Sequence, residues 1–114
     1  MAEEKLYENK IKIFLSEQGA WFVKYWSGLS SNGKQYTRNG IPDILCCIDG
    51  HFLAIEVKAA NGRPSEIQLH TINEIRKAGG FAFVLYPSGW DKFKQFVKDL
   101  KDEKFNREME VVLK

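Results

Sequence analysis

The sequence lacks any long run of apolar residues, and its first residues, Met-Ala-Glu-Glu-Lys, are acidic. A membrane-spanning helix needs about 20 consecutive apolar residues, and a secretory signal needs a basic start followed by an apolar segment. These absences exclude a membrane partner and predict a cytoplasmic protein. The sequence also has no P-loop and no dinucleotide-binding fingerprint, so we expect no nucleotide cofactor.

Cysteine and histidine are rare in the sequence, and the net charge is small. The only two cysteines, Cys46 and Cys47, are adjacent, which excludes a disulfide framework; we interpret both as small buried residues in a reducing compartment. The two histidines, His51 and His70, lack the partners of a zinc site or a catalytic triad, so surface positions are expected. A net charge of +2 permits a nucleic-acid partner but is too small to imply one.

What is present is enough for one globular domain. The chain has 114 residues, of which 44% are apolar and 28% charged, and a chain of this length can bury about two thirds of its unfolded surface. We expect a single domain over 1–114, with a core over 3–101 and a C-terminal tail over 102–114. The spacing of apolar residues and the turn signals predict this order of elements: helix 3–18, strand 21–26, a long polar loop 27–40, strands 44–48 and 52–58, helix 65–78, strand 81–86 and helix 90–101. This order, α-β-β-β-α-β-α, predicts an α/β fold with a mixed central sheet flanked by helices.

The pair Asp49-Gly50 between two apolar runs predicts a two-residue hairpin turn, because both central positions of that turn need positive φ. Ile48 then faces His51, and the same register places Asp43 opposite Glu56. Directly opposed residues share a face of the sheet, and Lys58, two residues after Glu56, projects from that face as well. The hairpin therefore gathers two carboxylates and an ammonium group at one end.

Two opposed carboxylates repel each other, so something must offset the repulsion. A shared proton, the amine of Lys58 and a divalent cation all satisfy this need. Paired carboxylates are hard ligands that suit Mg²⁺, and a cation held in this way can activate water for phosphodiester hydrolysis. The alternative is that the charged residues are solvated on an open sheet face. The residue pattern alone leaves both interpretations open.

The motifs Gly40-Ile41-Pro42-Asp43 and Ile55-Glu56-Val57-Lys58 resemble the signature of the PD-(D/E)XK nucleases. More narrowly, over about residues 8–86, the chain resembles the VRR-Nuc family, whose small stand-alone members occur in bacteria and phages. That resemblance implies a restriction-endonuclease-like core and a location in the cytoplasm of a bacterial or phage-infected cell. It also implies a Mg²⁺-dependent DNA endonuclease, with Mn²⁺ as a substitute, that acts on branched or four-way-junction DNA as a homodimer.

The resemblance implies a role for each matching residue. Asp43, Glu56 and the backbone carbonyl of Val57 would be metal ligands, and Lys58 would be the catalytic lysine. Glu8 in the first helix would reach the same metal directly or through water, and Gln68 would line the catalytic site.

Two of these residues have alternative interpretations. Glu8 lies at the rim of the apolar stripe of its helix, where it can also face solvent, and Glu3 and Glu4 compete for its role. Ser65 and Gln68 fit a capping box, which explains both residues without any catalytic role.

Basic and aromatic residues near the long loop are the predicted DNA contacts. Phosphate-binding positions are expected at Lys24, Lys34, Arg38 and Arg63, while Trp26 and Tyr36 could stack on unpaired bases. Each of these residues could equally belong to a solvated surface.

Two rival functions remain, namely a DNA-binding module that kept the nuclease fold without catalysis, and an interaction protein with no nucleic-acid role. A dimer would suit the two-fold symmetry of a junction. Its interface could use the last helix and tail, with Trp90, Phe93, Phe96, Val97, Val111 and Val112. Equally, these residues could complete the core.

Overall fold

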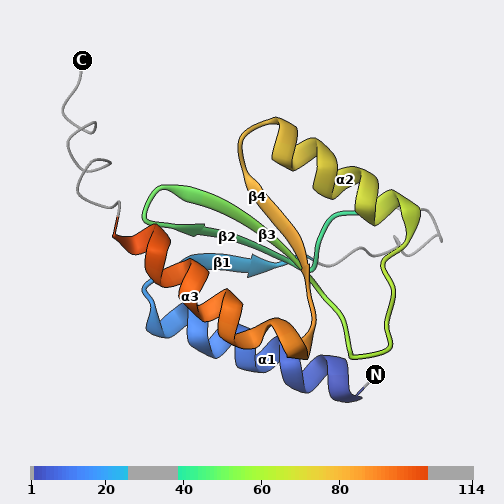
Figure 1. Cartoon of the computed structure of the whole chain (residues 1–114), viewed down its shortest axis with the longest axis horizontal. Helices are drawn as coiled ribbons and strands as arrows, with labels where there is room; N and C mark the ends of the chain where they lie inside the picture. The colour runs from blue at the N-terminus through green and yellow to red at the C-terminus, as the bar shows by residue number, and fades with distance from the viewer. Residues whose placement is uncertain (1, 26–38, 103–114) are drawn as a thin grey trace, which may run out of the picture.

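The computed structural model describes residues 2–25 and 39–102, and within them the predicted order of elements is confirmed (Figure 1). The helices are α1 (Ala2–Glu17), α2 (Glu66–Lys77) and α3 (Trp90–Lys101), and the strands are β1 (Trp21–Lys24), β2 (Ile44–Ile48), β3 (His51–Val57) and β4 (Phe81–Leu85); a short 3-10 helix, η1 (Pro87–Gly89), precedes α3. The architecture is consistent with a restriction-endonuclease-like fold.

The four strands form one mixed sheet in the order β1-β2-β3-β4. The first three strands are antiparallel and β4 runs parallel to β3, so α2 lies in the crossover between two parallel strands. The predicted hairpin register is confirmed, with Ile48 paired to His51 and Ile44 to Ile55. Asp49 and Gly50 have φ values of 48° and 85°, which is the positive-φ pair that the tight turn requires.

The main core lies between one face of the sheet and the pair α1 and α3, which lie side by side on that face (Figure 1). Alternation along β3 explains this arrangement, because every second side chain points to the same face. The fully buried members are the following: Ile11, Leu15, Ile44, Cys46, Ile48, Leu53, Ile55, Val57 and Val97. From α3, Phe93, Val97 and Leu100 are buried here, and Trp90 and Phe96 pack against them. The residues of the last helix therefore complete the core, while Val111 and Val112 lie outside the described residues.

The other face of the sheet is only partly covered. Helix α2 packs Ile72 onto Ala54 of β3 and Ala82 of β4. The cross-strand row Trp21–Cys47–Phe52 lies on the same face, since it is two residues along each strand from the row Val23–Leu45–Ala54. Trp21 is 67% exposed and Phe52 is 44% exposed. An apolar half of the sheet therefore faces outward beside α2.

Three sequence-based expectations need correction. The strand predicted over 21–26 ends at Lys24, although the backbone N–H of Tyr25 still donates to the carbonyl of Asp43. Cys46 is buried as expected, but Cys47 is exposed, because its side chain points to the half of the sheet that α2 leaves open. His51 is buried rather than on the surface, because its ring packs edge-on against Phe81. The loop over 27–40 is described only from residue 39 onward, and most of the tail also lies outside the described residues.

Candidate active site

Asp43 and Glu56 lie near each other at the end of the β2–β3 hairpin, close enough for the charge of Asp43 to act on Glu56. The paired ladder ends at Ile44 and Ile55, and Asp43 lies one residue beyond it. The backbone N–H of Val57 donates a hydrogen bond to Oδ2 of Asp43 at 2.8 Å. This bond fixes the Asp43 carboxylate against the end of β3.

The segment before Asp43 is held by close packing. Gly40 has a φ of 80°, and a Cβ atom there would lie 2.8 Å from the carbonyl oxygen of Ile67. Only glycine fits this position without strain, because it combines a left-handed conformation with direct contact to α2. Pro42 is fully buried. The Gly-Ile-Pro-Asp motif therefore sets the path that delivers Asp43 to the sheet end.

Glu56 is the most deeply buried acid of the site, with 2% exposure. Its Oε2 atom accepts a hydrogen bond from Nε2 of Gln68 at 2.9 Å and lies 3.2 Å from Nζ of Lys58. Its Oε1 atom is buried and has no hydrogen-bond partner among the described residues. Burial and the charge of Asp43 raise the pKa of Glu56 to about 7, although Lys58 acts in the opposite direction. One oxygen of this carboxylate is therefore held by Gln68 and Lys58, and the other has no hydrogen-bond donor among the described residues.

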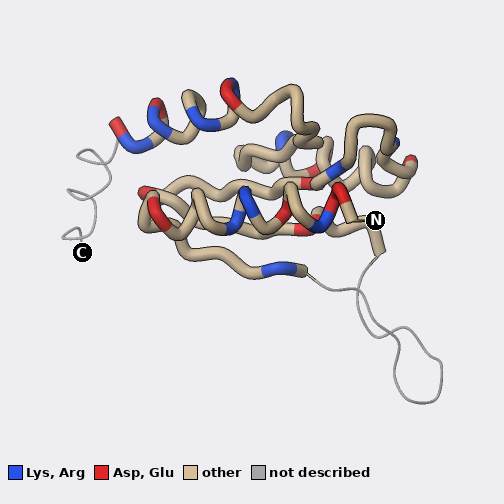
Figure 2. The backbone as a smooth tube through the Cα atoms, turned by 90° about the horizontal axis from the view of Figure 1, so that it is seen from below, with Lys and Arg blue, Asp and Glu red and all other residues tan. Residues whose placement is uncertain are grey.

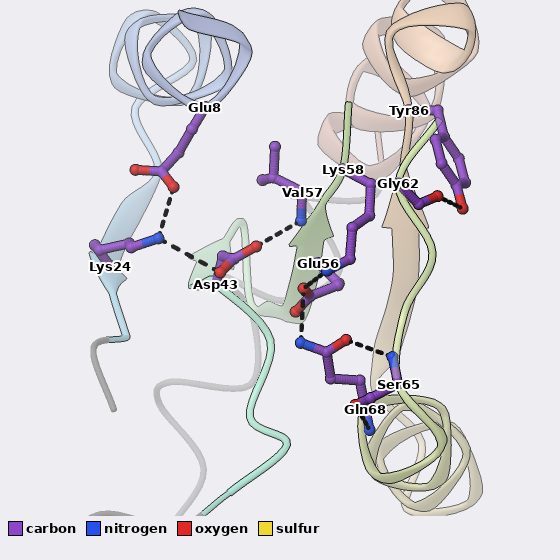
Figure 3. Close-up of polar contacts among 10 residues, drawn as sticks. All are labelled: Glu8, Lys24, Asp43, Glu56, Val57, Lys58, Gly62, Ser65, Gln68 and Tyr86. Carbon is purple, nitrogen blue, oxygen red and sulfur yellow. Dashed lines mark hydrogen bonds and ion pairs between the residues drawn. The ribbon is translucent and has the colours of Figure 1, made fainter. Parts of the chain in front are cut away.

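Gln68 forms the predicted capping box and at the same time contacts Glu56 (Figure 3). Ser65 is the N-cap of α2, its Oγ accepts from the backbone N–H of Gln68, and the Oε1 of Gln68 accepts from the backbone N–H of Ser65. The Nε2 of the same amide donates to Glu56. The capping box therefore connects the start of α2 to a carboxylate of the site.

Of the two competitors of Glu8, Glu3 is exposed, and Glu4 is half-buried with its charge acting on Glu56. Glu8 itself is 4% exposed and is linked to Asp43 through Lys24. Its Oε1 accepts from Nζ of Lys24 at 2.6 Å, and its Oε2 lies 3.2 Å from Nζ of Lys12. Burial alone would raise the pKa of Glu8, but the hydrogen bonds and charges of the two lysines outweigh burial and lower it. Glu8 is therefore a buried anion with its own counterions.

Lys24 bridges the acids of α1 and the hairpin (Figure 3). Its Nζ contacts Oε1 of Glu8 at 2.6 Å and Oδ1 of Asp43 at 3.4 Å. Its row, Lys24–Ile44–Ile55, is on the face covered by α1, which explains why the side chain meets Glu8. Burial lowers the pKa of Lys24, but the hydrogen bond to Glu8 and the two carboxylate charges raise it overall.

Sequence reasoning placed Lys24 among the DNA contacts and did not connect it with the acids. It also missed Lys12, although Glu8 and Lys12 have the i, i+4 spacing of helical ion pairs, a signal that could have found this contact. It further missed Tyr86, whose hydroxyl donates to the carbonyl of Gly62 at 2.9 Å and so fixes the loop after Lys58. A lone tyrosine at the end of a strand gives no comparable signal.

The acidic residues fit a Mg²⁺ ion that keeps several waters. Among residues 2–25 and 39–102 no group of three or more acidic, histidine or cysteine side chains is arranged to hold a metal. Asp43 and Glu56 nevertheless offer hard oxygens, and the buried Oε1 of Glu56 lacks a protein donor. Mg²⁺ typically takes one or two carboxylates and retains water. The two-carboxylate set fits, with Glu8 separated from Asp43 by Lys24.

Of the other predicted DNA contacts, Arg63 is exposed on the loop after β3 and lines a polar hollow with Asn61, Tyr86 and Ser88. Lys34, Arg38, Trp26 and Tyr36 lie outside the described residues. Charged residues of both signs follow α1 and α3 (Figure 2), so neither helix presents a purely basic surface. In the described part of the chain, no helix is long and apolar enough to cross a bilayer.

A comparison with family models finds a match to the family described as archaeal Holliday junction resolvase (Hjc), over residues 3–108. The match covers both carboxylates of the hairpin, Lys58, Gln68 and Glu8. A comparison with the curated proteins finds no match.

Proposed function

The chain belongs to the archaeal Holliday junction resolvase (Hjc) family, and from that premise we propose that it is a metal-dependent endonuclease that cleaves branched DNA, above all four-way junctions. The family is PD-(D/E)XK-like and implies a nuclease, in agreement with the broader resemblance read from the motifs. The narrower resemblance to the VRR-Nuc branch stays a prediction. The observation that carries the proposal is the convergence of Asp43, Glu56 and Lys58 at one end of the hairpin.

Lys58 is the residue to which we assign charge stabilisation. Its side chain is 16% exposed and its Nζ lies 3.2 Å from Oε2 of Glu56. An ammonium group held in a partly water-excluded site stabilises negative charge that develops on a phosphate, because it needs no reorganisation during the reaction. Tyr86 holds the following loop through Gly62, and this contact limits the freedom of the segment that follows Lys58.

We assign metal binding to Asp43 and Glu56, with the carbonyl of Val57 as a further ligand and Glu8 acting through water. When bound, Mg²⁺ or Mn²⁺ would supply an activated water and offset charge on the scissile phosphate. The chain's own contribution is to hold the two carboxylates in place: Val57 fixes Asp43 through its N–H, and Gln68 fixes Glu56 through its amide. Preorganised ligands of this kind lower the cost of reaching the reactive geometry.

The DNA path is proposed to run past the start of α2. Helix N-termini favour phosphate groups through their free N–H groups and dipole, and Arg63 is exposed just before α2 begins. Lys34 and Arg38, which lie in the sequence between β1 and Asp43, are proposed to contribute further phosphate contacts. Backbone contacts of this kind make binding fall steeply with salt.

We also propose that the protein acts as a homodimer through the open half of the sheet. A four-way junction needs two symmetric cuts, and one chain holds one set of Asp43, Glu56 and Lys58. The row Trp21–Cys47–Phe52 is exposed, apolar and free of charge. A surface without cations does not suit phosphate, whereas exposed apolar patches commonly mark protein interfaces. A second copy of the chain is therefore the proposed occupant.

The test is cleavage of a labelled four-way junction and of a linear duplex with the same arm sequences, each with Mg²⁺, Mn²⁺ or EDTA. We expect paired cuts in the junction with either metal, little cleavage of the duplex and none in EDTA. Salt-dependent junction binding without any cleavage would favour the rival, a non-catalytic DNA-binding module. Absence of DNA binding would contradict both.

A further inference from the structure

Lys24 already occupies an oxygen that the proposed metal ligand must offer. Asp43 has two carboxylate oxygens, and Oδ2 accepts the backbone N–H of Val57 at 2.8 Å. Oδ1 faces Nζ of Lys24 at 3.4 Å. Both oxygens of Asp43 therefore have partners, and the partner of Oδ1 is a side chain rather than the backbone.

The two contacts of Lys24 are unequal. Its Nζ lies 2.6 Å from Glu8 and 3.4 Å from Asp43, and the side chain is 34% exposed. The contact with Asp43 is therefore the weaker of the two and the easier one to break. Glu8 also has Lys12 at 3.2 Å and Lys5 at 3.8 Å, so its buried charge stays compensated when Lys24 moves.

We propose that Lys24 and the divalent cation exchange on Asp43, so that cation binding displaces the Lys24 ammonium from Oδ1 and loss of the cation brings it back. This inference rests on the proposed function, because it takes Asp43 as a metal ligand. Lys24 is then a positioning residue: it holds Asp43 and Glu8 together when no metal does, and it sets the metal affinity of the site. Like charges repel, so a divalent ion and an ammonium group that contact the same carboxylate oxygen weaken each other's binding to it.

The first test is a titration of DNA-free protein with Mn²⁺, in which the electron paramagnetic resonance of the free ion is followed. Wild type is compared with Lys24→Met, with Lys12→Met as the matched control and with Asp43→Asn as the ligand control. Lys12 contacts Oε2 of Glu8, whereas Oδ1 of Asp43 faces Lys24, so the Lys12 variant removes a similar charge without freeing Oδ1. We expect Lys24→Met to bind Mn²⁺ about tenfold more tightly, because the ammonium charge no longer competes with the cation for Oδ1 of Asp43. Lys12→Met should stay close to wild type, and Asp43→Asn should lose binding.

An affinity of Lys24→Met equal to or weaker than wild type would overturn the exchange while leaving the proposed nuclease function intact. Failure of wild type to bind Mn²⁺ would overturn the metal dependence itself, and the exchange with it.

A second measurement uses only wild-type protein, so it holds even where Lys24→Met folds poorly. The side-chain ¹⁵Nζ resonances of Lys24 and Lys12 are followed by NMR during addition of Mg²⁺. We expect a large shift and faster hydrogen exchange at Lys24, with a smaller change at Lys12. An unchanged Lys24 resonance at saturating Mg²⁺ would contradict displacement.

Discussion

The Nε2 of Gln68 donates to Oε2 of Glu56 at 2.9 Å while the Oε1 of the same amide accepts from the backbone N–H of Ser65 at 2.8 Å. One side chain thus belongs both to the cap of α2 and to the carboxylate site. The start of the helix and the position of Glu56 are therefore coupled, and the two roles can be separated by mutation.

Replacement of Gln68 by Ala should reduce both stability and cleavage. Loss of a charged hydrogen bond is worth about 1.5–3 kcal/mol, which corresponds to a fall in single-turnover rate of about 10- to 100-fold if all of it appears in the transition state. Ser65→Ala is the matched control, since it removes the other half of the cap and should lower the free energy of unfolding by about 1 kcal/mol with little effect on rate. Urea unfolding and single-turnover cleavage measure the two quantities. Equal rates for the two variants would show that Gln68 is only a cap.

Gly40→Ala and Gly19→Ala form a pair that separates steric overlap from backbone strain. Both glycines have φ near 80°, but a Cβ at Gly19 meets nothing within 4 Å, whereas a Cβ at Gly40 lies 2.8 Å from the carbonyl oxygen of Ile67. We expect Gly19→Ala to cost about 1–2 kcal/mol of unfolding free energy from the left-handed conformation alone. Gly40→Ala should cost about 1–3 kcal/mol more from overpacking. If urea unfolding shows equal losses of unfolding free energy for the two variants, α2 can shift away from residue 40 without cost, which would contradict the close packing.

The raised pKa of Glu56 predicts a pH dependence of stability in EDTA. Its pKa is 4.5 ordinarily and about 7 in the folded protein, so between these values the folded state holds a proton that the unfolded chain has released. This contribution to stability is fully present below about pH 4.5 and is lost as the pH rises through 7. Glu8, whose pKa is lowered, has the opposite dependence, and its contribution is lost only on acidification below pH 4.5.

Urea unfolding between pH 5 and pH 8 should therefore show wild type losing up to about 3 kcal/mol, since one pKa unit corresponds to about 1.4 kcal/mol. Glu56→Gln cannot titrate and should lack this slope, so the difference between the two proteins isolates Glu56. Parallel curves for wild type and variant would contradict the assignment of the raised pKa to this residue.

Phe52→Asp should convert a dimer into a monomer. Phe52 is 44% exposed on the open half of the sheet, so an aspartate there can be solvated in a monomer but would be buried without a partner in the proposed interface. Leu6→Asp is the control, because Leu6 is 70% exposed on α1 and lies outside the proposed interface. Sedimentation velocity at micromolar concentration distinguishes the species. A monomeric wild type, or a Phe52→Asp variant that stays dimeric, would rule out this interface.

The hairpin was predictable because its determinants are local. Asp49-Gly50 fixes the turn, the turn fixes the register, and the register brings Asp43 to Glu56 without knowledge of any other element. The burial of Leu53, Ile55 and Val57 follows from the same alternation along one strand.

The remainder depends on how separate elements pack. Lys24 meets Glu8 only because α1 covers the face to which Lys24 points, and no pattern within either segment shows this. Likewise, Cys47 is exposed because α2 covers only half of its face of the sheet. Gln68 both caps α2 and contacts Glu56 because the helix begins beside Glu56. A capping motif in the sequence does not show how far the helix start lies from another strand.

The most direct test of the account is single-turnover cleavage of a four-way junction by wild type and Lys58→Met in Mg²⁺, with junction affinity measured in parallel. Lys98→Met, an exposed position on α3, is the control for loss of one positive charge. We predict that Lys58→Met binds the junction within about threefold of wild type but cleaves at least about 10²-fold more slowly, since removal of one preorganised charge-stabilising group costs about 10²–10³ in rate. A Lys58→Met variant that cleaves at the rate of wild type would contradict the assignment of the active site to the end of the β2–β3 hairpin.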